Sequence, residues 1–449
     1  MNTFKRRMTE VWVYPQICKH RDGISDTGKY LSFLDTQGQN KDLLIYFHIP
    51  FCETLCFFCS YYKEPLHKYT YEQKKRFFNN CRIELENYAK KLYFKNAKVK
   101  AVQFGGGTPS AIEPEFIDLM INTVKDCFDT HMCEVISMEG NVASLQSEAK
   151  LNELKGIGIK RISFGVQTLN ENIRKKVGIK AKTSDVFKAV ETIKKVGFED
   201  FSLDLMYNLP EQTIDDMLND IRVVDSMGPA YIDVYNLNVF PNTRFKEYID
   251  DDEYFADKPT DEKEIIMFKE IMKSMSQMGY NQVMVNTFSK YKKSPPKTLD
   301  LYLNGSDVLG IGPSSRSYLN KRNFRNIPDV DDYNKAVESG LFPVEAGNIA
   351  SDIEDIERKL VFFSNYTYIK KSEITNLEYF SEKIRYLIDN GLAKEDNEYL
   401  YLTEEGKAWP GNISLLFFNE KQRNKRATSF IDALKYKENP YNQDRMGIF

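Results

Sequence analysis

Short apolar stretches that alternate with amphipathic ones constrain the fold of this 449-residue chain most strongly. Six of the apolar stretches are rich in β-forming residues, and we expect strands at residues 43–48, 99–104, 134–138, 161–164, 201–206 and 231–237. The segments between them show helical periodicity, with helices expected at residues 72–93, 114–128, 144–155, 183–196, 213–226 and 261–278. Strands that alternate with helices form parallel β–α–β units. We therefore predict an α/β fold in which six strands close, or nearly close, into a barrel.

Three cysteines lie close together in the loop that follows the first predicted strand: Cys52, Cys56 and Cys59. Several thiolates from one short loop can bind the same iron–sulfur cluster. Three thiolates hold three irons of a [4Fe–4S] cluster, and the fourth iron then stays open to a substrate or cofactor. A zinc site is one alternative, although structural zinc normally needs four ligands and no nearby Cys or His pair completes such a spacing. Chance clustering is the other alternative.

Glycines and polar residues end or follow the later predicted strands. They are the glycine run at residues 105–107, Glu139, Gln167, Asp204 and Asn238. Barrels of parallel strands carry their chemistry at the C-terminal strand ends, so these residues and the cysteine loop should surround one mouth. Glycines let backbone N–H groups approach a ligand closely, and the Glu139 carboxylate is suited to ribose hydroxyls. A single polar residue at a strand end is often structural, but their convergence favours a polar ligand.

The composition is that of an ordinary globular protein. Hydrophobic residues make up 42% and charged residues 28% of the chain, and the net charge is −3. This balance gives no reason to expect nucleic acid or an anionic membrane as a partner. No apolar run approaches the roughly 18 residues that span a bilayer. No apolar segment follows the basic residues at 5–7, so we expect no secretory signal.

Cysteine usage indicates a reducing compartment. The chain has seven cysteines, an odd number, and three of them are clustered. This pattern favours a metal centre over a disulfide framework, and we expect a cytoplasmic protein. The remaining cysteines are expected to be core or incidental residues: Cys18, Cys81, Cys127 and Cys133.

The flanking regions show other patterns. Residues 1–40 are expected to form a leader that packs on or beside the barrel of residues 41–296, with residues 11–15 as a surface strand or plug that could cover the site. Residues 297–349 are expected to be a connecting region, with a turn-rich loop at 307–314. Residues 350–449 predict helices at 353–363 and 380–390 and a hairpin near 399–402, an order typical of a winged helix. We expect this region to be a lid or packing domain, and the basic stretch at 421–426 to be a solvated face.

Several segments together resemble the HemN-type radical S-adenosylmethionine (SAM) family, whose best-known member is oxygen-independent coproporphyrinogen III oxidase. The matching segments are residues 46–59, 105–109, 139, 165–167, 203–210 and 310–315. The resemblance is clear over about residues 43–320 and loose in the C-terminal part. It implies a partial (β/α)6 barrel with a C-terminal helical domain. It also implies a [4Fe–4S] cluster on Cys52, Cys56 and Cys59 that cleaves SAM to a 5′-deoxyadenosyl radical.

The same resemblance implies where SAM would bind. Tyr46, Gly106, Glu139 and Arg316 fall at positions that touch the first SAM. Some members bind a second SAM, and the corresponding positions are Phe58, Gly107, Thr108, Gln167, Asp204 and Asn238. An electron donor such as flavodoxin or ferredoxin is expected to reduce the cluster.

The sequence departs from the oxidase pattern at three places. In the oxidases Gly-Cys-Asn follows the third cysteine, whereas here the next residues are Ser60-Tyr61-Tyr62-Lys63. Ile179 occupies the position of an arginine that contacts the second SAM, and Asn208 replaces a glycine. The pattern Phe-Phe-Cys-x-Tyr-Tyr-x-x-Pro at 57–65 looks more like the methyltransferase branch of the family. That branch includes class C radical SAM methyltransferases and heme-utilisation enzymes that open heme anaerobically.

The leading hypothesis is an enzyme that transfers a one-carbon unit to a planar aromatic or tetrapyrrole substrate. Trp12, Phe57, Tyr61 and Tyr62 could form aromatic walls for such a ring, although ordinary core packing is an equal alternative. One alternative function is oxidative decarboxylation of coproporphyrinogen III. Another is a heme-binding chaperone, a role that some relatives have. The polar groups retained at the second-SAM positions favour an enzyme over the chaperone.

Overall fold

A computed structural model describes residues 4, 7, 8, 10–17, 28, 31–39, 42–240, 243–251 and 253–424. Cys18, the first two residues of the basic cluster at 5–7 and the end of the basic stretch at 421–426 lie outside these residues. Predictions made for them therefore stay predictions. Among the residues that are described, no helix combines the length and the apolar character needed to cross a membrane.

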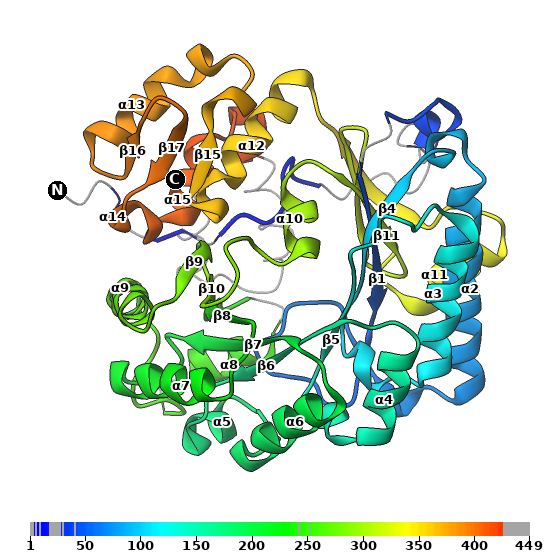
Figure 1. Ribbon diagram of the computed structural model, residues 1–449, viewed down its shortest axis with the longest axis horizontal. Helices are drawn as coiled ribbons and strands as arrows, with labels where there is room; N and C mark the ends of the chain where they lie inside the picture. Colours follow the sequence, from blue (N-terminus) through cyan, green and yellow to red (C-terminus); the bar gives the residue numbers. More distant parts are fainter. Residues whose placement is uncertain are drawn as a thin grey trace.

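One twelve-stranded sheet forms the centre of the molecule (Figure 1). Its middle part consists of six neighbouring parallel strands in chain order, namely β1 (Asp42–Ile49), β4 (Lys98–Gly106), β5 (Val135–Gly140), β6 (Arg161–Gln167), β7 (Asp200–Tyr207) and β8 (Tyr231–Asn236). All six predicted strands are confirmed. The sheet stays open because its edges are two different strands, β14 (Val344–Ile349) and β9 (Asn281–Met284). The fold is thus the expected α/β partial barrel.

Helices cover the outer face of the curved sheet (Figure 1). They are α2 (Tyr71–Ala89), α3 (Pro114–Cys127), α4 (Glu148–Gly156), α5 (Glu171–Lys176), α6 (Thr183–Val196), α7 (Ile214–Ser226) and α9 (Asp261–Gln277). Local sequence sets several ends. Thr70 and Thr213 accept hydrogen bonds from the first turns of α2 and α7. Gly197, at φ +86°, ends α6 in the left-handed conformation that glycine adopts without strain. These signals explain why the predicted helices lie close to the observed ones.

The prediction of a connecting loop after Pro296 is wrong. This part of the chain contains α10 (Lys297–Leu303), β11 (Asp307–Ile311), β12 (Arg316–Leu319), β13 (Arg322–Asn326) and α11 (Val330–Glu338) before β14. Strand β11 pairs in parallel with β1, and the next three strands extend the same sheet. Gly310, interpreted as a turn residue, lies inside β11, where a side chain would overlap the backbone of Arg316. The glycine serves a close strand approach rather than a turn.

The C-terminal region contains the predicted helices and hairpin. Helix α12 (Asp352–Tyr366) is followed by β15 (Tyr368–Lys370), α13 (Ser381–Asp389), β16 (Ala393–Glu395), β17 (Tyr399–Leu402), α14 (Glu404–Lys407) and α15 (Pro410–Leu416). Strands β16 and β17 form the antiparallel hairpin, and β15 joins it as a third strand. Figure 1 shows this region beside the open edge of the barrel, near β9 and β10 (Thr287–Ser289).

Candidate functional site at the barrel mouth

The cysteine loop follows β1 and is fixed at several points. Cys52 ends the short strand β2 (Phe51–Cys52), which pairs with β3 (Glu64–Pro65). Within the loop, the Lys63 ammonium donates to the backbone oxygen of Cys59 at 2.6 Å. The N–H of Phe245 donates to the oxygen of Phe57 at 3.0 Å. Cys56 is half-buried, and burial followed by the neighbouring Cys59 raises its thiol pKa to about 11. The thiols therefore influence one another, as expected for ligands of one cluster.

The donor set fits an iron–sulfur cluster better than a single ion. Cys52, Cys56 and Cys59 are all free thiols. Across the described part of the chain, no group of three or more Cys, His, Asp or Glu side chains converges as a mononuclear site would require. A [4Fe–4S] cage is larger, and each cysteine binds a different iron. Zinc, the alternative that the sequence left open, would have only three of the four ligands that a structural zinc site normally needs.

The glycine run is tied directly to the cysteine loop. The N–H of Gly107 donates to the oxygen of Ile49 at 2.7 Å, and the N–H of Thr108 donates to that of Phe51 at 2.8 Å. A side chain at residue 107 would lie 2.7 Å from the Phe51 oxygen, so only glycine fits. The Thr108 hydroxyl also lies 3.6 Å from the Cys52 sulfur. The predicted proximity of these two motifs is confirmed.

Glu139 lies at the end of β5 beside the glycine run. Its carboxylate accepts hydrogen bonds from the N–H of Gly106 at 3.1 Å and from the Gln103 amide at 2.9 Å. Burial raises the pKa of Glu139, and these two hydrogen bonds oppose the rise. A side chain at residue 105 would touch both Glu139 and the Tyr46 ring, so these two predicted SAM contacts are neighbours.

His48 is a site residue that the sequence analysis missed. It lies two residues after Tyr46 on the same face of β1, and its Nδ1 is 3.3 Å from the Tyr46 hydroxyl. Its Nε2 lies 3.2 Å from the backbone oxygen of Tyr62, directly after the cysteines. The side chain is only 4% exposed, and burial lowers its pKa to about 4, so the ring is neutral at pH 7. The period of two along a strand was the available signal.

Two carboxylates lie side by side inside the barrel. Asp204 on β7 and Asp233 on β8 are partners in the strand register. Asp233 accepts a hydrogen bond from the Thr287 hydroxyl at 2.5 Å. Burial, then Asp233 and then Glu139 raise the pKa of Asp204 well above its usual range. The structure differs from the expectation here, because Asp204 lies within β7 and not at its end. The sequence analysis did not single out Asp233.

The positions predicted for a second SAM have mixed surroundings. Gln167 ends β6 with φ +68°, a strained conformation for a non-glycine residue, and its amide folds over Gly165. Phe58 and Ile179 pack against an apolar cluster that includes Met206. The nearby Arg174 is buried, and its guanidinium donates to the backbone oxygens of residues 166, 168 and 181. Arg174 therefore does not take the place of the arginine that is missing at position 179.

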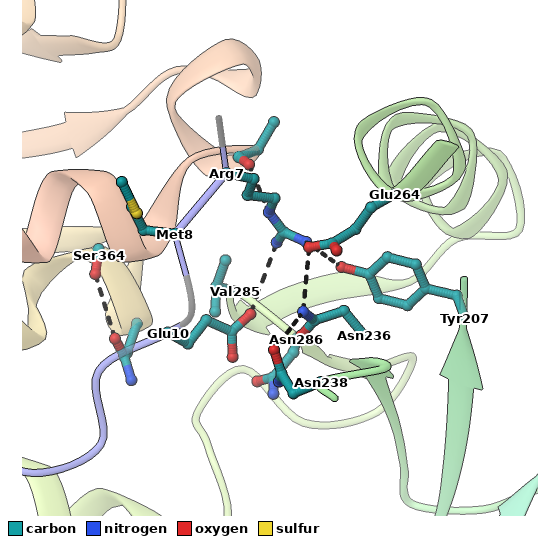
Figure 2. A network of polar contacts seen from close by, with 12 residues as sticks. Arg7, Met8, Glu10, Tyr207, Asn236, Asn238, Glu264, Val285, Asn286 and Ser364 are labelled. Atoms are coloured by element: carbon teal, nitrogen blue, oxygen red, sulfur yellow. Dashed lines mark hydrogen bonds and ion pairs between the residues drawn. The ribbon is translucent and has the colours of Figure 1, made fainter. Parts of the chain in front are cut away.

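The N-terminal segment is fixed across the edge of this mouth (Figure 2). The Arg7 guanidinium donates to the Glu264 carboxylate and to the Tyr207 hydroxyl, each at 2.6 Å, and to the oxygen of Ala408 at 2.8 Å. The Asn236 amide donates to Glu264 at 3.1 Å and to Asn238 at 3.2 Å. One network thus joins the leader, the ends of β7 and β8, helix α9 and the C-terminal region. Asn238, a predicted second-SAM contact, belongs to it.

Comparison with known proteins agrees with this geometry. Residues 46–224 match the Radical SAM superfamily. The heme chaperone HemW of Bacillus subtilis (strain 168) is 27% identical over 391 residues, covering 84% of this chain and 99% of the relative. The anaerobilin synthase of Escherichia coli O157:H7 is 25% identical, covering 82% of both chains. These matches support the HemN-type radical SAM family, which the sequence resembles.

A solved structure supports the fold of this HemN-type protein. The coproporphyrinogen III oxidase HemN from Escherichia coli, described as a radical SAM enzyme, matches with a TM-score of 0.74. The match covers 92% of this chain and 99% of that one, at 21% sequence identity. The family implies a [4Fe–4S] cluster and SAM, and the residues described above fit both.

Proposed function

We propose that this HemN-type protein is an enzyme that cleaves SAM at a [4Fe–4S] cluster and acts on a tetrapyrrole or a related planar ring. The arrangement of Glu139 and Gly106 over the cysteine loop carries the proposal. The Glu139 carboxylate, which is suited to ribose hydroxyls, accepts from the N–H of Gly106. The next two residues donate to the backbone that leads into the cysteine loop, and the Thr108 hydroxyl lies 3.6 Å from the Cys52 sulfur. A reduced [4Fe–4S] cluster held by Cys52, Cys56 and Cys59 would supply the electron for reductive cleavage of SAM. The electron donor would be flavodoxin or ferredoxin.

The chain's own residues would bind and orient the cofactors. Cys52, Cys56 and Cys59 would hold the cluster. Tyr46 and Glu139 would position the first SAM, with Gly106 giving its backbone room to approach. Neutral His48 fixes the Tyr46 hydroxyl and connects it to the cysteine loop through Tyr62. Tyr61 has 68% of its surface exposed beside Glu139, so its ring is available to a flat substrate.

Transfer of a one-carbon unit from a second SAM is the finer proposal. Phe58, Gly107, Thr108, Gln167, Asp204 and Asn238 are the positions that would contact this molecule. Asp204 supports the proposal, because its half-buried carboxyl lies within the barrel, where it can accept from the donor groups of SAM. The apolar surroundings of Ile179 indicate that the second SAM binds more weakly than the first.

The products of turnover test this proposal. Anaerobically reconstituted protein, supplied with reductant, SAM and a tetrapyrrole, should form 5′-deoxyadenosine together with S-adenosylhomocysteine. Asp204→Ala should suppress formation of S-adenosylhomocysteine while sparing the cluster. Asp225→Ala, which changes a residue outside the barrel, should leave the formation of S-adenosylhomocysteine unchanged. If turnover of coproporphyrinogen III yields only 5′-deoxyadenosine, methionine and carbon dioxide, oxidative decarboxylation replaces one-carbon transfer.

A heme chaperone is the second candidate function. The supporting observation is that HemW of Bacillus subtilis aligns over nearly its whole length with this chain. Two results together would favour the chaperone over the enzyme. The protein would bind heme stoichiometrically and transfer it to an apoprotein, and adding a tetrapyrrole would not raise 5′-deoxyadenosine above the level formed without it.

A further inference from the structure

A small cavity lies deep on the open side of the barrel, where three parts of the chain meet. Strands β11 and β12 form one wall, the N-terminal segment at residues 12–14 a second, and helix α12 a third. The residues that matter here are Trp12, Tyr302, Arg316, Tyr318, Arg358 and Phe362. Two arginines and several aromatic rings thus line one space. Arg316 is also a predicted contact of the first SAM, and Trp12 a predicted aromatic wall, whereas Arg358 has no predicted role.

Arg358 is a buried cation that forms no ion pair with any of the residues that the structure describes. Its side chain is 5% exposed and lies over the rings of Tyr318, at 4.2 Å, and Phe362, at 4.7 Å. Two of its nitrogens donate to the backbone oxygens of Tyr302 and Leu303, while Nε has no partner within the described chain. The carboxylate of Asp355 lies close enough to act on the Arg358 charge. It already accepts a hydrogen bond from the Tyr318 hydroxyl, however, and pairs with Lys321.

Arg316 is the second cation that lines this cavity. Arg316 is the first residue of β12. Its guanidinium forms no recorded ion pair or side-chain hydrogen bond with the described residues. Its register partner on β13 is another arginine, Arg325, whose charge is paired with Glu345 at 2.7 Å. Uncompensated buried charges are costly. A cavity lined by the buried Arg358 and the half-buried Arg316 is complementary to an anion, and arginine forks suit planar carboxylates best.

The size of the cavity selects the group that can enter. About 20 Å³ is open to the centre of a water-sized sphere, and a single water needs roughly 10–15 Å³ by this measure. The space therefore fits the two oxygens of a carboxylate but not a ring. Its surroundings are aromatic, with Trp12 and Tyr302 beside the arginines, so the group would extend from a larger apolar body.

The register of the sheet gives the depth of the cavity. Val308, which lines it, pairs with Leu44, whereas Tyr46 pairs with Gly310. Two residues along a strand correspond to roughly 7 Å. The Val308 end of the cavity thus lies deeper in the barrel than Tyr46, the predicted SAM contact. A carboxylate bound at Arg358 would belong to a molecule beneath SAM.

We propose that Arg316 and Arg358 bind a carboxylate side chain of the substrate, with Trp12 and Tyr302 packing against its carbon skeleton. This deepens the proposed function, on which it rests, by restricting the substrate to a carboxylate-bearing ring. The N-terminal segment then forms part of the substrate site, which explains its anchoring by Arg7 (Figure 2). The carboxylate of SAM is the alternative ligand for these arginines. Arg316 lies at the level of Gly310 and of Tyr46, the predicted SAM contact.

Binding of porphyrin acids and esters tests the proposal. Reconstituted full-length protein is titrated with coproporphyrin I and with its tetramethyl ester in the same non-ionic detergent. The wild type should bind the acid at least about tenfold more tightly, since hydrogen bonds to charged groups contribute roughly 1.5–3 kcal/mol. Arg358→Gln should remove this preference without changing the affinity for the ester. Equal binding of acid and ester by the wild type would overturn the proposal.

A matched control and a SAM titration separate the alternatives. Arg322 is also an arginine stacked on an aromatic ring, 4.6 Å from the centre of Phe33, but it does not line the cavity. Arg322→Gln should therefore keep the preference for the acid. If Arg358→Gln weakens SAM binding and leaves the preference intact, the pocket serves SAM and the proposal is wrong. Arg316→Gln provides the second variant should Arg358→Gln fail to fold.

A probe without a ring keeps the test independent of the proposed function. Propionate should raise the melting temperature of the wild type relative to the same concentration of chloride, and should raise it less in Arg316→Gln and Arg358→Gln. If neither porphyrin binds while propionate stabilises only proteins with both arginines, the carboxylate site stands and the tetrapyrrole assignment fails. If propionate has the same effect on all of them and the acid shows no advantage, the carboxylate site is wrong.

Discussion

The backbone N–H of Gly106 donates to the carboxylate of Glu139 at 3.1 Å, which joins the ends of two neighbouring barrel strands. The same carboxylate is the predicted acceptor for the ribose of SAM. Glu139→Ala should weaken SAM binding about tenfold or more, because hydrogen bonds to a charged group contribute roughly 1.5–3 kcal/mol. Equilibrium dialysis with reconstituted protein measures this, and iron content should stay unchanged. An unaltered SAM affinity would exclude the ribose role.

The cysteine loop should determine the cluster by itself. Wild-type protein reconstituted without oxygen should carry about four irons and four sulfides, by the cluster chemistry that three thiolates imply. Changing Cys52, Cys56 and Cys59 together to Ala should abolish the brown chromophore. Single replacements of Cys81, Cys127 or Cys133, which lie elsewhere in the fold, should keep it. A triple variant with a normal absorption spectrum and iron content would contradict the assignment.

The Arg7–Glu264 pair should hold the N-terminal segment in place. Both side chains are buried, at 2% and 1% exposure, and lie 257 residues apart in the chain. Arg7→Ala removes the cation that pairs with the buried Glu264 carboxylate, so the free energy of unfolding in urea should fall by about 3–5 kcal/mol.

The control for this pair is Lys195, which contacts Glu148 on the surface at 2.6 Å. Lys195→Ala should change stability by no more than about 1 kcal/mol. Similar losses in the Arg7 and Lys195 variants would show that the Arg7 anchor adds nothing beyond a surface pair.

Glu84 should make stability depend on pH. Burial raises its pKa to about 7, against hydrogen bonds from Tyr333, Gly312 and Asn326. Between pH 4.5 and pH 7 the folded state thus keeps a proton that the unfolded state releases, so this carboxyl's contribution to stability falls as pH rises through that range.

Glu84→Gln removes the titrating group. As pH rises from 5 to 8, the wild type should therefore lose stability relative to the variant, as measured by urea unfolding. Glu72→Gln, on the exposed side of the same helix, provides the comparison. A difference between wild type and Glu84→Gln that is constant with pH would contradict the raised pKa.

Local sequence determined the elements and most of the mouth. Apolar runs and caps act over a few residues, so all six parallel strands and the covering helices other than the short α5 could be predicted. Parallel strands end at one edge, which brought Gly106 and Glu139 beside the cysteine loop as expected. Strand β11 was missed because Gly310 signals a turn locally, whereas in the fold it allows the close approach of β12, which is formed by later residues.

Only the tertiary structure decided which charges lack partners and which distant segments meet. Nothing near Arg7 in the sequence indicates Glu264, and nothing near Arg358 indicates a cavity shared with Arg316 and Trp12. Such contacts depend on how the leader and the C-terminal region pack on the barrel, and the energy of a buried charge is set by all the groups around it. A local pattern carries no record of those groups. The sequence therefore predicted the cofactor chemistry, while the packing of distant segments decided the surroundings of Arg316 and Arg358.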